Sequence, residues 1–311
     1  MGSEAATLRA DDYPSRVGGD GHVLPRLDPV VHANVAGGVT GPLRPGQLVA
    51  FGRDGFLAFE ALLPGHFVEE LMAELSRLSE VLADRELPEV IREPGSGTLR
   101  SIFAVHRRPG PFARLARDPR IVRMAEQILD SEVYLHQTRV NLKPGFEGRE
   151  FYWHSDFETW HVEDGMPRMR AVSVSVSLTP NHEWNAPLLL IPGSHRHYVA
   201  CDGRTPENHH EKSLRKQEYG TPSQQALRWL VERGGIASMT GRAGSAALFD
   251  CNTMHGSNGN ITPYPRTNVF LVYNSVNNAL EEPFGGVPPR PEFLAARRVE
   301  PVSGDGGDGG R

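Results

Sequence analysis

The chain has 311 residues, of which 39% are hydrophobic and 23% charged, and its formal net charge is -5 at pH 7. This mildly acidic balance argues against a nucleic-acid-binding protein, which needs a broad basic surface, and no apolar stretch approaches the length of a membrane span. Cys201 and Cys251 are too few for a disulfide framework, so we expect free thiols in a cytoplasmic protein that lacks a secretory signal.

The composition divides the chain into three parts. Residues 1–46 are rich in Gly, Pro, Asp and Arg without sustained periodicity, which predicts an irregular N-terminal arm. Residues 303–311 are mostly Gly and Asp and predict a disordered tail. Residues 47–302 are long enough for one barrel or sandwich with flanking helices, and we expect them to form a single domain.

Two amphipathic helices are predicted in the first half of the chain. Apolar residues recur at helical spacing from Phe67 to Leu82, so they share one face. Asp118 followed by Pro119 is typical of a helix N-cap and first helical position, and the apolar spacing continues to Ile128.

The segment Trp153-His154-Ser155-Asp156 comes next, and we expect it to be extended. Side chains two residues apart on a strand project to the same side, so His154 and Asp156 can direct an imidazole nitrogen and a carboxylate oxygen at one point. The motif alone is weak evidence, because such pairs also occur in solvated loops and at strand edges.

Short strands and one more helix follow. Alternating Val and Ser predict a strand at 171–178 with one apolar and one small polar face, and apolar runs predict strands at 188–191, 245–249 and 268–273. A third helix is predicted from Thr221-Pro222 to Gly234-Gly235. These elements indicate a mainly β protein with flanking helices, a double-stranded β-helix (jelly-roll, cupin-like) barrel whose mouth is a natural small-molecule site.

His255 is the best candidate for a third metal ligand, because a strand ending near Phe249 would bring it to the barrel mouth. Two histidines and one carboxylate on one face leave coordination positions open, which is typical of non-haem iron(II) oxygenases. A 2-oxoacid and O2 could occupy those positions. Arg266 follows, and a guanidinium can hold the distal carboxylate of 2-oxoglutarate through two parallel hydrogen bonds.

Other possible ligands fall into three groups, His161 with Glu163 and Asp164, His195 with His197, and His209 with His210. The first group is typical of a solvated loop of mixed charge. Neither histidine pair combines a carboxylate at strand spacing with a later arginine, and we expect His195 to be structural.

The run from Phe151 to Pro167, FYWHSDFETWHVEDGMP, resembles the characteristic segment of the ectoine hydroxylases, a branch of the phytanoyl-CoA dioxygenase-like superfamily. The resemblance covers most of residues 48–284, and a seventeen-residue match is far more specific than the metal motif inside it. Two positions depart from the family pattern, since Ala186 stands where glycine is expected and Cys251 where serine is usual.

The resemblance implies a jelly-roll homodimer that hydroxylates ectoine to 5-hydroxyectoine, using iron(II), 2-oxoglutarate and O2 and releasing succinate and CO2. Carried over by position, it implies iron ligands His154, Asp156 and His255, 2-oxoglutarate contacts Lys143, Arg266, Asn141 and Ser257, and ectoine contacts Gln137, Trp160, Phe249 and Phe270.

These residue types suit such a substrate. Ectoine is a zwitterion with a delocalised amidinium cation, and tryptophan offers the best aromatic face for a cation, which favours Trp160. Gln137 could hydrogen-bond the polar edge of the ring, whereas Phe249 and Phe270 are also explained by core packing. Asp156 favours hydroxylation, because halogenases of this architecture lack the carboxylate.

Three alternatives remain open at this point. A related hydroxylase of another small cyclic or amino-acid metabolite would keep the iron and 2-oxoglutarate residues but need not keep Gln137 and Trp160. A non-catalytic solute-binding jelly roll would need neither an open triad nor a carboxylate clamp. A zinc-dependent cupin-like enzyme could use the same ligands.

Overall fold

The computed structural model describes residues 11–18, 21–33, 41–206, 209, 214 and 219–303. At its centre a larger antiparallel sheet has the order β2 (Phe56–Phe59), β11 (Ala246–Asp250), β7 (Ala171–Ser177), β13 (Arg266–Ser275), β5 (Val133–Lys143), β4 (Leu99–Phe103) and β3 (Val90–Arg92). A smaller antiparallel sheet has the order β10 (Ala237–Met239), β8 (Leu188–Leu190), β12 (His255–Ser257) and β6 (Phe151–His154).

The two sheets face each other across an apolar cluster. Leu188 and Leu190 of the smaller sheet pack there against Ala247, Phe249 and Phe270 of the larger one. Two opposed antiparallel sheets with a shared interior are the jelly-roll arrangement, which confirms the predicted fold class.

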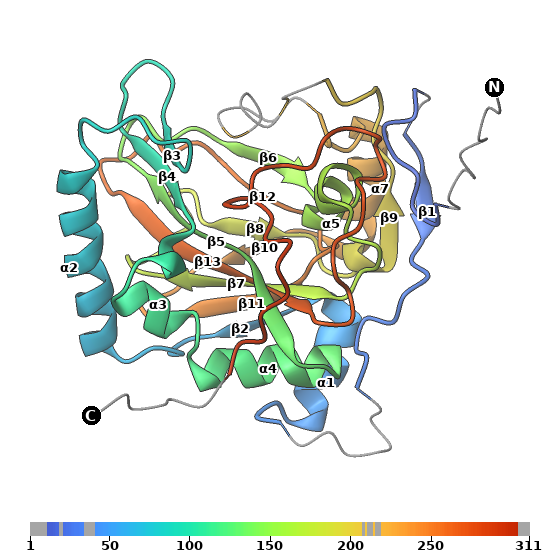
Figure 1. Cartoon of the computed structure of the whole chain (residues 1–311), viewed down its shortest axis with the longest axis horizontal. Helices are drawn as coiled ribbons and strands as arrows, with labels where there is room; N and C mark the ends of the chain where they lie inside the picture. The colour runs from blue at the N-terminus through green and yellow to red at the C-terminus, as the bar shows by residue number, and fades with distance from the viewer. Residues whose placement is uncertain are drawn as a thin grey trace, which may run out of the picture.

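Helices cover the outer face of the larger sheet (Figure 1). They are α1 (Pro45–Asp54), α2 (Gly65–Val81), α3 (Pro111–Leu115) and α4 (Pro119–Leu129). The helices predicted from Phe67 and from Asp118 are confirmed. The Asp118 carboxylate accepts a hydrogen bond from the Arg120 backbone N–H at 3.0 Å and so caps α4.

The Val–Ser alternation of β7 separates two environments, as predicted. Val172, Val174 and Val176 belong to the core shared with the helices. The intervening serines face the interior between the sheets, where Ser173 donates a hydrogen bond to Asp156 at 3.2 Å. Both faces of the strand are buried.

The start predicted for the third helix is wrong. The helix α7 (Gln224–Gly234) begins after Ser223, and the Ser223 hydroxyl, not Thr221, accepts the hydrogen bond from the Ala226 N–H, at 3.2 Å. Its predicted end at Gly235 is confirmed. A cap forms where the hydroxyl can reach the third N–H of the helix, and that geometry selects between neighbouring hydroxyl residues.

The arm and the tail are partly described. In the arm, Val23–Pro25 form β1, which pairs with β9 (His197–Val199) at the right of Figure 1. Tyr13 is fully buried, so the arm packs on the body of the protein. Residues 304–311 of the predicted tail lie outside the described residues.

Both cysteines are buried free thiols, as expected. Ala186 has a φ of +63°, the left-handed region that glycine adopts without penalty, so alanine at this position carries backbone strain. Within the described ranges, no helix combines the length and the apolar character needed to cross a membrane.

Candidate metal centre and adjoining pockets

His154 and Asp156 belong to different elements. His154 is the last residue of β6, and Asp156 is the first residue of α5 (Asp156–Thr159), so the expectation of one continuous strand is wrong. Ser155 between them remains extended, with φ -103° and ψ 131°. The two side chains therefore still project to the same side.

His255 reaches the same point from β12. The chain leaves the larger sheet after Asp250 and enters the smaller one at His255, so β12 delivers this residue in place of a continuation of β11. In the β12–β6 pairing His255 lies opposite His154. Their ring centroids are 4.2 Å apart.

The three side chains converge. Asp156 Oδ1 lies 3.8 Å from His154 Nε2 and 3.9 Å from His255 Nε2. Among the described residues, no other group of three or more His, Cys, Asp or Glu residues gathers its ligand atoms in this way. The predicted triad is therefore assembled by the fold.

The hydrogen bonds of the two imidazoles suit a metal. His154 Nδ1 lies 2.7 Å from the Tyr152 carbonyl oxygen and His255 Nδ1 lies 3.0 Å from that of Thr253. A carbonyl oxygen only accepts, so each Nδ1 carries the proton and each Nε2 directs a lone pair at the centre. His255 Nε2 is buried and has no hydrogen-bond partner among the described residues, as expected of an atom that binds a cation.

The protonation states also suit a divalent cation. Burial lowers the pKa of His154 to about 3, with a smaller contribution from His255, and burial lowers the pKa of His255 as well. Burial raises the pKa of Asp156, but His255, Arg139 and His154 outweigh it, and the pKa lies below its ordinary value. At neutral pH the site thus holds two neutral imidazoles and one carboxylate.

A cavity of about 300 Å³ adjoins the triad and contains an unpaired cation. Arg266 lines it and is 1% exposed, yet its Nε and Nη1 atoms have no hydrogen-bond partner among the described residues. Burial, helped by Arg100, lowers the pKa of Arg266 to about 10. A buried guanidinium with free donors is costly unless an anion pairs with it, so this cavity fits a carboxylate.

The other residues predicted to hold 2-oxoglutarate surround Arg266. Asn141 and Ser257 line the same cavity. Lys143 is the register partner of Arg266 across β5 and β13, and its Nζ donates to Ser257 Oγ at 2.7 Å and to the Asn258 carbonyl at 2.5 Å. Lys143 thus stands behind Ser257 and orients it.

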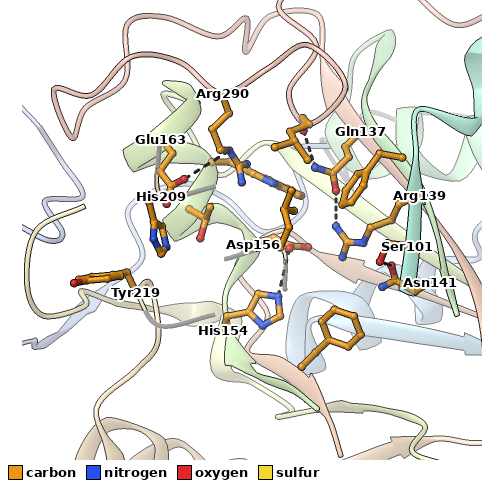
Figure 2. A pocket seen from close by; sticks show the side chains of 16 residues that line it. Ser101, Gln137, Arg139, Asn141, His154, Asp156, Glu163, His209, Tyr219 and Arg290 are labelled. Carbon is orange, nitrogen blue, oxygen red and sulfur yellow. Dashed lines mark hydrogen bonds and ion pairs between the residues drawn. The ribbon is translucent and has the colours of Figure 1, made fainter. Parts of the chain in front are cut away.

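A larger cavity of about 690 Å³, partly open to solvent, lies on the other side of His154 and Asp156. Gln137 and Trp160 line it, as predicted for the substrate site. Figure 2 shows Gln137 and Arg139 on one side of this cavity and Arg290 and Glu163 on the other. This cavity is the large pocket.

The two predicted phenylalanines lie elsewhere. Phe270 lines the smaller cavity beside Arg266. Phe249 is fully buried in the cluster between the sheets, and its ring centroid is 5.1 Å from that of His255. Their contact with substrate stays a prediction.

Sequence reasoning missed two arginines of the large pocket. Arg139 donates to Gln137 Oε1 and lies between Gln137 and Asn141 at spacings of two along β5, a period that could have identified it. Arg290 comes from an irregular segment and donates to both carboxylate oxygens of Asp164, at 2.7 and 2.6 Å. No local pattern marks Arg290.

The expectation of a solvated loop at His161, Glu163 and Asp164 is wrong. These residues lie in the helical turn η2 (Trp160–Asp164) and are at most 3% exposed. They are buried because partners distant in sequence pair with them, including Arg290 and the arm residue Arg16.

Among the described residues, neither of the other two histidine pairs joins the triad. His195 lies 3.3 Å, through Nε2, from the Gly52 carbonyl oxygen, in keeping with the structural role that we expect. His209 lines the large pocket, and His210 lies outside the described residues.

Comparison with known proteins relates this chain to dioxygenases, by a family model and by the sequence of a relative. The family model described as phytanoyl-CoA dioxygenase matches residues 51–268. The ectoine dioxygenase of Bordetella bronchiseptica is 54% identical over 289 residues, which are 93% of each chain.

Two solved structures are similar over nearly the whole fold. EctD from S. alaskensis with 2-oxoglutarate and 5-hydroxyectoine is 49% identical, with a TM-score of 0.83, over 94% of this chain and 97% of that one. EctD from the same organism with bound Fe is 46% identical, with a TM-score of 0.83, over 94% and 98% of the two chains.

Proposed function

We propose, from the premise that this chain belongs to the phytanoyl-CoA dioxygenase family, that it converts ectoine to 5-hydroxyectoine. Ectoine, 2-oxoglutarate and O2 are consumed, and 5-hydroxyectoine, succinate and CO2 are formed. The observation that carries the proposal is the placement of the His154–Asp156–His255 group between two cavities, one with an unpaired buried guanidinium and one with an aromatic and cationic lining. A protein named ectoine dioxygenase and a solved structure that contains 5-hydroxyectoine are each similar to this chain over more than nine-tenths of its length.

The smaller cavity is the proposed 2-oxoglutarate site. Arg266 would hold the distal carboxylate through its free Nε and Nη1 donors. Ser257, fixed by Lys143, and Asn141, whose Oδ1 accepts from Ser101 Oγ at 2.8 Å, would hold the polar remainder. His154 and His255 also line this cavity, so the co-substrate would lie against the metal ligands.

The large pocket is the proposed ectoine site. The Trp160 face suits the amidinium cation. The ectoine carboxylate needs a cation, and Arg290 offers one, because its pairing with Asp164 uses Nε and Nη2 and its Nη1 forms no hydrogen bond with the described residues. Gln137 is held by a bond from Nε2 to the Leu294 carbonyl at 2.6 Å and would fix the orientation of the ring.

The three ligands would hold iron(II) at the wall shared by the two cavities. With 2-oxoglutarate and O2, bound iron(II) supplies the oxidant that replaces a C–H bond of an unactivated methylene by C–OH. The protein's own residues bind the two organic molecules on either side of that point.

The test is turnover by the purified protein with iron(II), 2-oxoglutarate, ascorbate and ectoine, followed by identification of the product by NMR. We expect 5-hydroxyectoine and an equal amount of succinate, both lost when iron(II) is omitted. Parallel reactions with proline and other compatible solutes separate this activity from that of a related hydroxylase. Product from a rival solute with none from ectoine would disprove the substrate, and restoration of activity by zinc would disprove the iron requirement.

We also propose a homodimer and a cytoplasmic location. The dimer follows from the family resemblance, and light scattering of the purified protein tests it. The location is supported by the two buried free thiols, which are usual in a reducing compartment. Cell fractionation tests it.

A further inference from the structure

A buried ion pair joins the N-terminal arm to the helical segment next to the metal centre. Arg16 Nε and Nη2 donate to the two oxygens of Glu158 at 2.9 and 2.6 Å, and Arg16 Nη1 donates to Glu163 Oε1. Ser15 adds a hydrogen bond from Oγ to Glu158 Oε1 at 2.6 Å. The Arg16 and Glu158 side chains are each 1% exposed. Solvent therefore screens this ion pair much less than it screens an ion pair on the surface.

The local backbone is shaped around this pair. Arg16 has a φ of +57°, a left-handed region that is unfavourable for a non-glycine residue and persists where surrounding contacts hold it. Gly220 packs against the same ion pair. It has a φ of +69°, and a Cβ at this position would collide with Arg16 Nη2 and Glu158 Oε2. Both segments thus accept unusual backbone to enclose the guanidinium.

Glu163 links this pair to the large pocket. Its Oε2 lies 3.8 Å from Arg290 Nε, while Arg290 is committed to Asp164 at 2.7 and 2.6 Å. Figure 2 shows Glu163 and Arg290 side by side at one wall of the pocket. Three carboxylates, those of Glu158, Glu163 and Asp164, therefore share the guanidiniums of Arg16 and Arg290.

We propose that Arg16 is a positioning residue for the substrate pocket, holding Glu158 and Glu163 so that the Arg290 guanidinium remains available to the substrate carboxylate. This inference rests on the proposed function. Among the described residues, Glu163 forms ion pairs only with Arg16 and Arg290. When Arg16 is removed, Arg290 is the one guanidinium of this pair that is left for Glu163. A carboxylate that pairs with Arg290 competes directly with the carboxylate of the substrate.

The location of the ion pair allows this role to be separated from simple support of the metal centre. Glu158 lies two residues after Asp156 in α5, so a purely structural loss would also disturb iron and 2-oxoglutarate binding. An effect through Glu163 and Arg290 acts on ectoine alone, because these two residues line the large pocket and not the cavity beside Arg266.

The experiment compares Arg16→Met with Arg26→Met in the full-length iron(II) enzyme. Arg26 is a matched control, because it is another arm arginine buried against a carboxylate, Asp250 at 2.7 Å, and it lines neither cavity. KM and kcat are measured separately for ectoine and for 2-oxoglutarate. Ectoine affinity is also measured by calorimetry without O2, in the presence of iron(II) and 2-oxoglutarate.

We expect Arg16→Met to raise the KM and the Kd for ectoine about tenfold, while the KM for 2-oxoglutarate stays within about twofold. Arg16→Lys keeps the charge without the forked geometry and should give a smaller rise, about threefold. In the double variant Arg16→Met with Glu163→Gln, the neutral amide no longer competes for Arg290, and the ectoine KM should return to within about threefold of wild type. Arg26→Met should leave the ectoine KM unchanged even where it lowers Tm.

Several outcomes would overturn the assignment. Unchanged ectoine affinity in both Arg16 variants, equal effects on ectoine and 2-oxoglutarate, or no rescue by Glu163→Gln would each show that Arg16 only supports the fold. Should Arg16→Met not fold, the Arg16→Lys variant alone and with Glu163→Gln decides by the same pattern. Wild-type protein that leaves ectoine unchanged would disprove the proposed function together with this inference. Normal turnover of ectoine by the wild type, with an unchanged ectoine KM in the Arg16 variants, would disprove only the role of Arg16.

Discussion

Replacement of Arg266 by methionine should weaken 2-oxoglutarate binding without destabilising the ligand-free protein. Arg266 is fully buried, and its Nε and Nη1 donors have no partner in the described structure. Hydrogen bonds to charged groups contribute about 1.5–3 kcal/mol each, so losing two of them costs about 3–6 kcal/mol. The KM for 2-oxoglutarate should therefore rise about 10²- to 10⁴-fold.

Arg266→Met should weaken ligand binding but should not lower the stability of the ligand-free protein. An unpaired buried polar group costs about 1–3 kcal/mol, so Arg266→Met should keep or raise the Tm of the protein without 2-oxoglutarate. Wild-type protein should gain about 2.7 kcal/mol when 2-oxoglutarate is present at about 100 times its Kd, because the ligand binds only the folded state. The variant should lose that gain.

The assay is succinate formation against 2-oxoglutarate concentration at saturating ectoine and iron(II), together with thermal unfolding with and without 2-oxoglutarate. Arg290→Met is the matched variant, since it removes a second buried guanidinium from the other cavity and should raise the KM for ectoine instead. An Arg266→Met enzyme whose KM for 2-oxoglutarate stays within about threefold of wild type would refute the reasoning from the unpaired donors.

Three further predictions concern the triad, the aromatic wall and pH. His154→Ala and Asp156→Ala should each lower turnover at least about 10³-fold and abolish the rise in Tm on adding iron(II), and turnover near the wild-type rate would exclude them as ligands. Trp160→Ala should raise the KM for ectoine up to about 30-fold, as a desolvated cation–π contact of about 2 kcal/mol implies, with the KM for 2-oxoglutarate as the control. Burial, with Arg290 adding to it, lowers the pKa of His136 from 6.5 to about 3. Between pH 6.5 and about 3, His136 is therefore protonated in the unfolded chain but neutral in the folded protein. The free energy of unfolding should consequently fall by up to about 1.4 kcal/mol per pH unit as the pH decreases through this range. Denaturant unfolding between pH 6 and 4.5 should show a shallower fall in His136→Gln, and equal slopes in the two proteins would contradict the assignment.

Local patterns predicted the elements whose apolar residues repeat with one period. The α2 and α4 helices and the β7 strand were found because each has one face in the helix-covered core and a distinct opposite face. The strand β5 was missed because Gln137, Arg139, Asn141 and Lys143 replace the apolar residues of an ordinary interior face. The strand reads as polar in sequence since it builds the two cavities.

The sequence by itself determined the jelly-roll class, and it predicted His154, Asp156 and His255 as metal ligands and Arg266 as the arginine for the co-substrate. Each of these depends on residue type together with spacing, or on a long matching segment, and both are visible in the chain. Only the tertiary structure decided that His255 lies opposite His154, that Arg290 shares a wall with Glu163, and that Arg16 holds Glu163 from the other side. Burial of a charged side chain depends on where its counter-charge is folded to, and these partners are separated by more than a hundred residues, so no local pattern can contain that information.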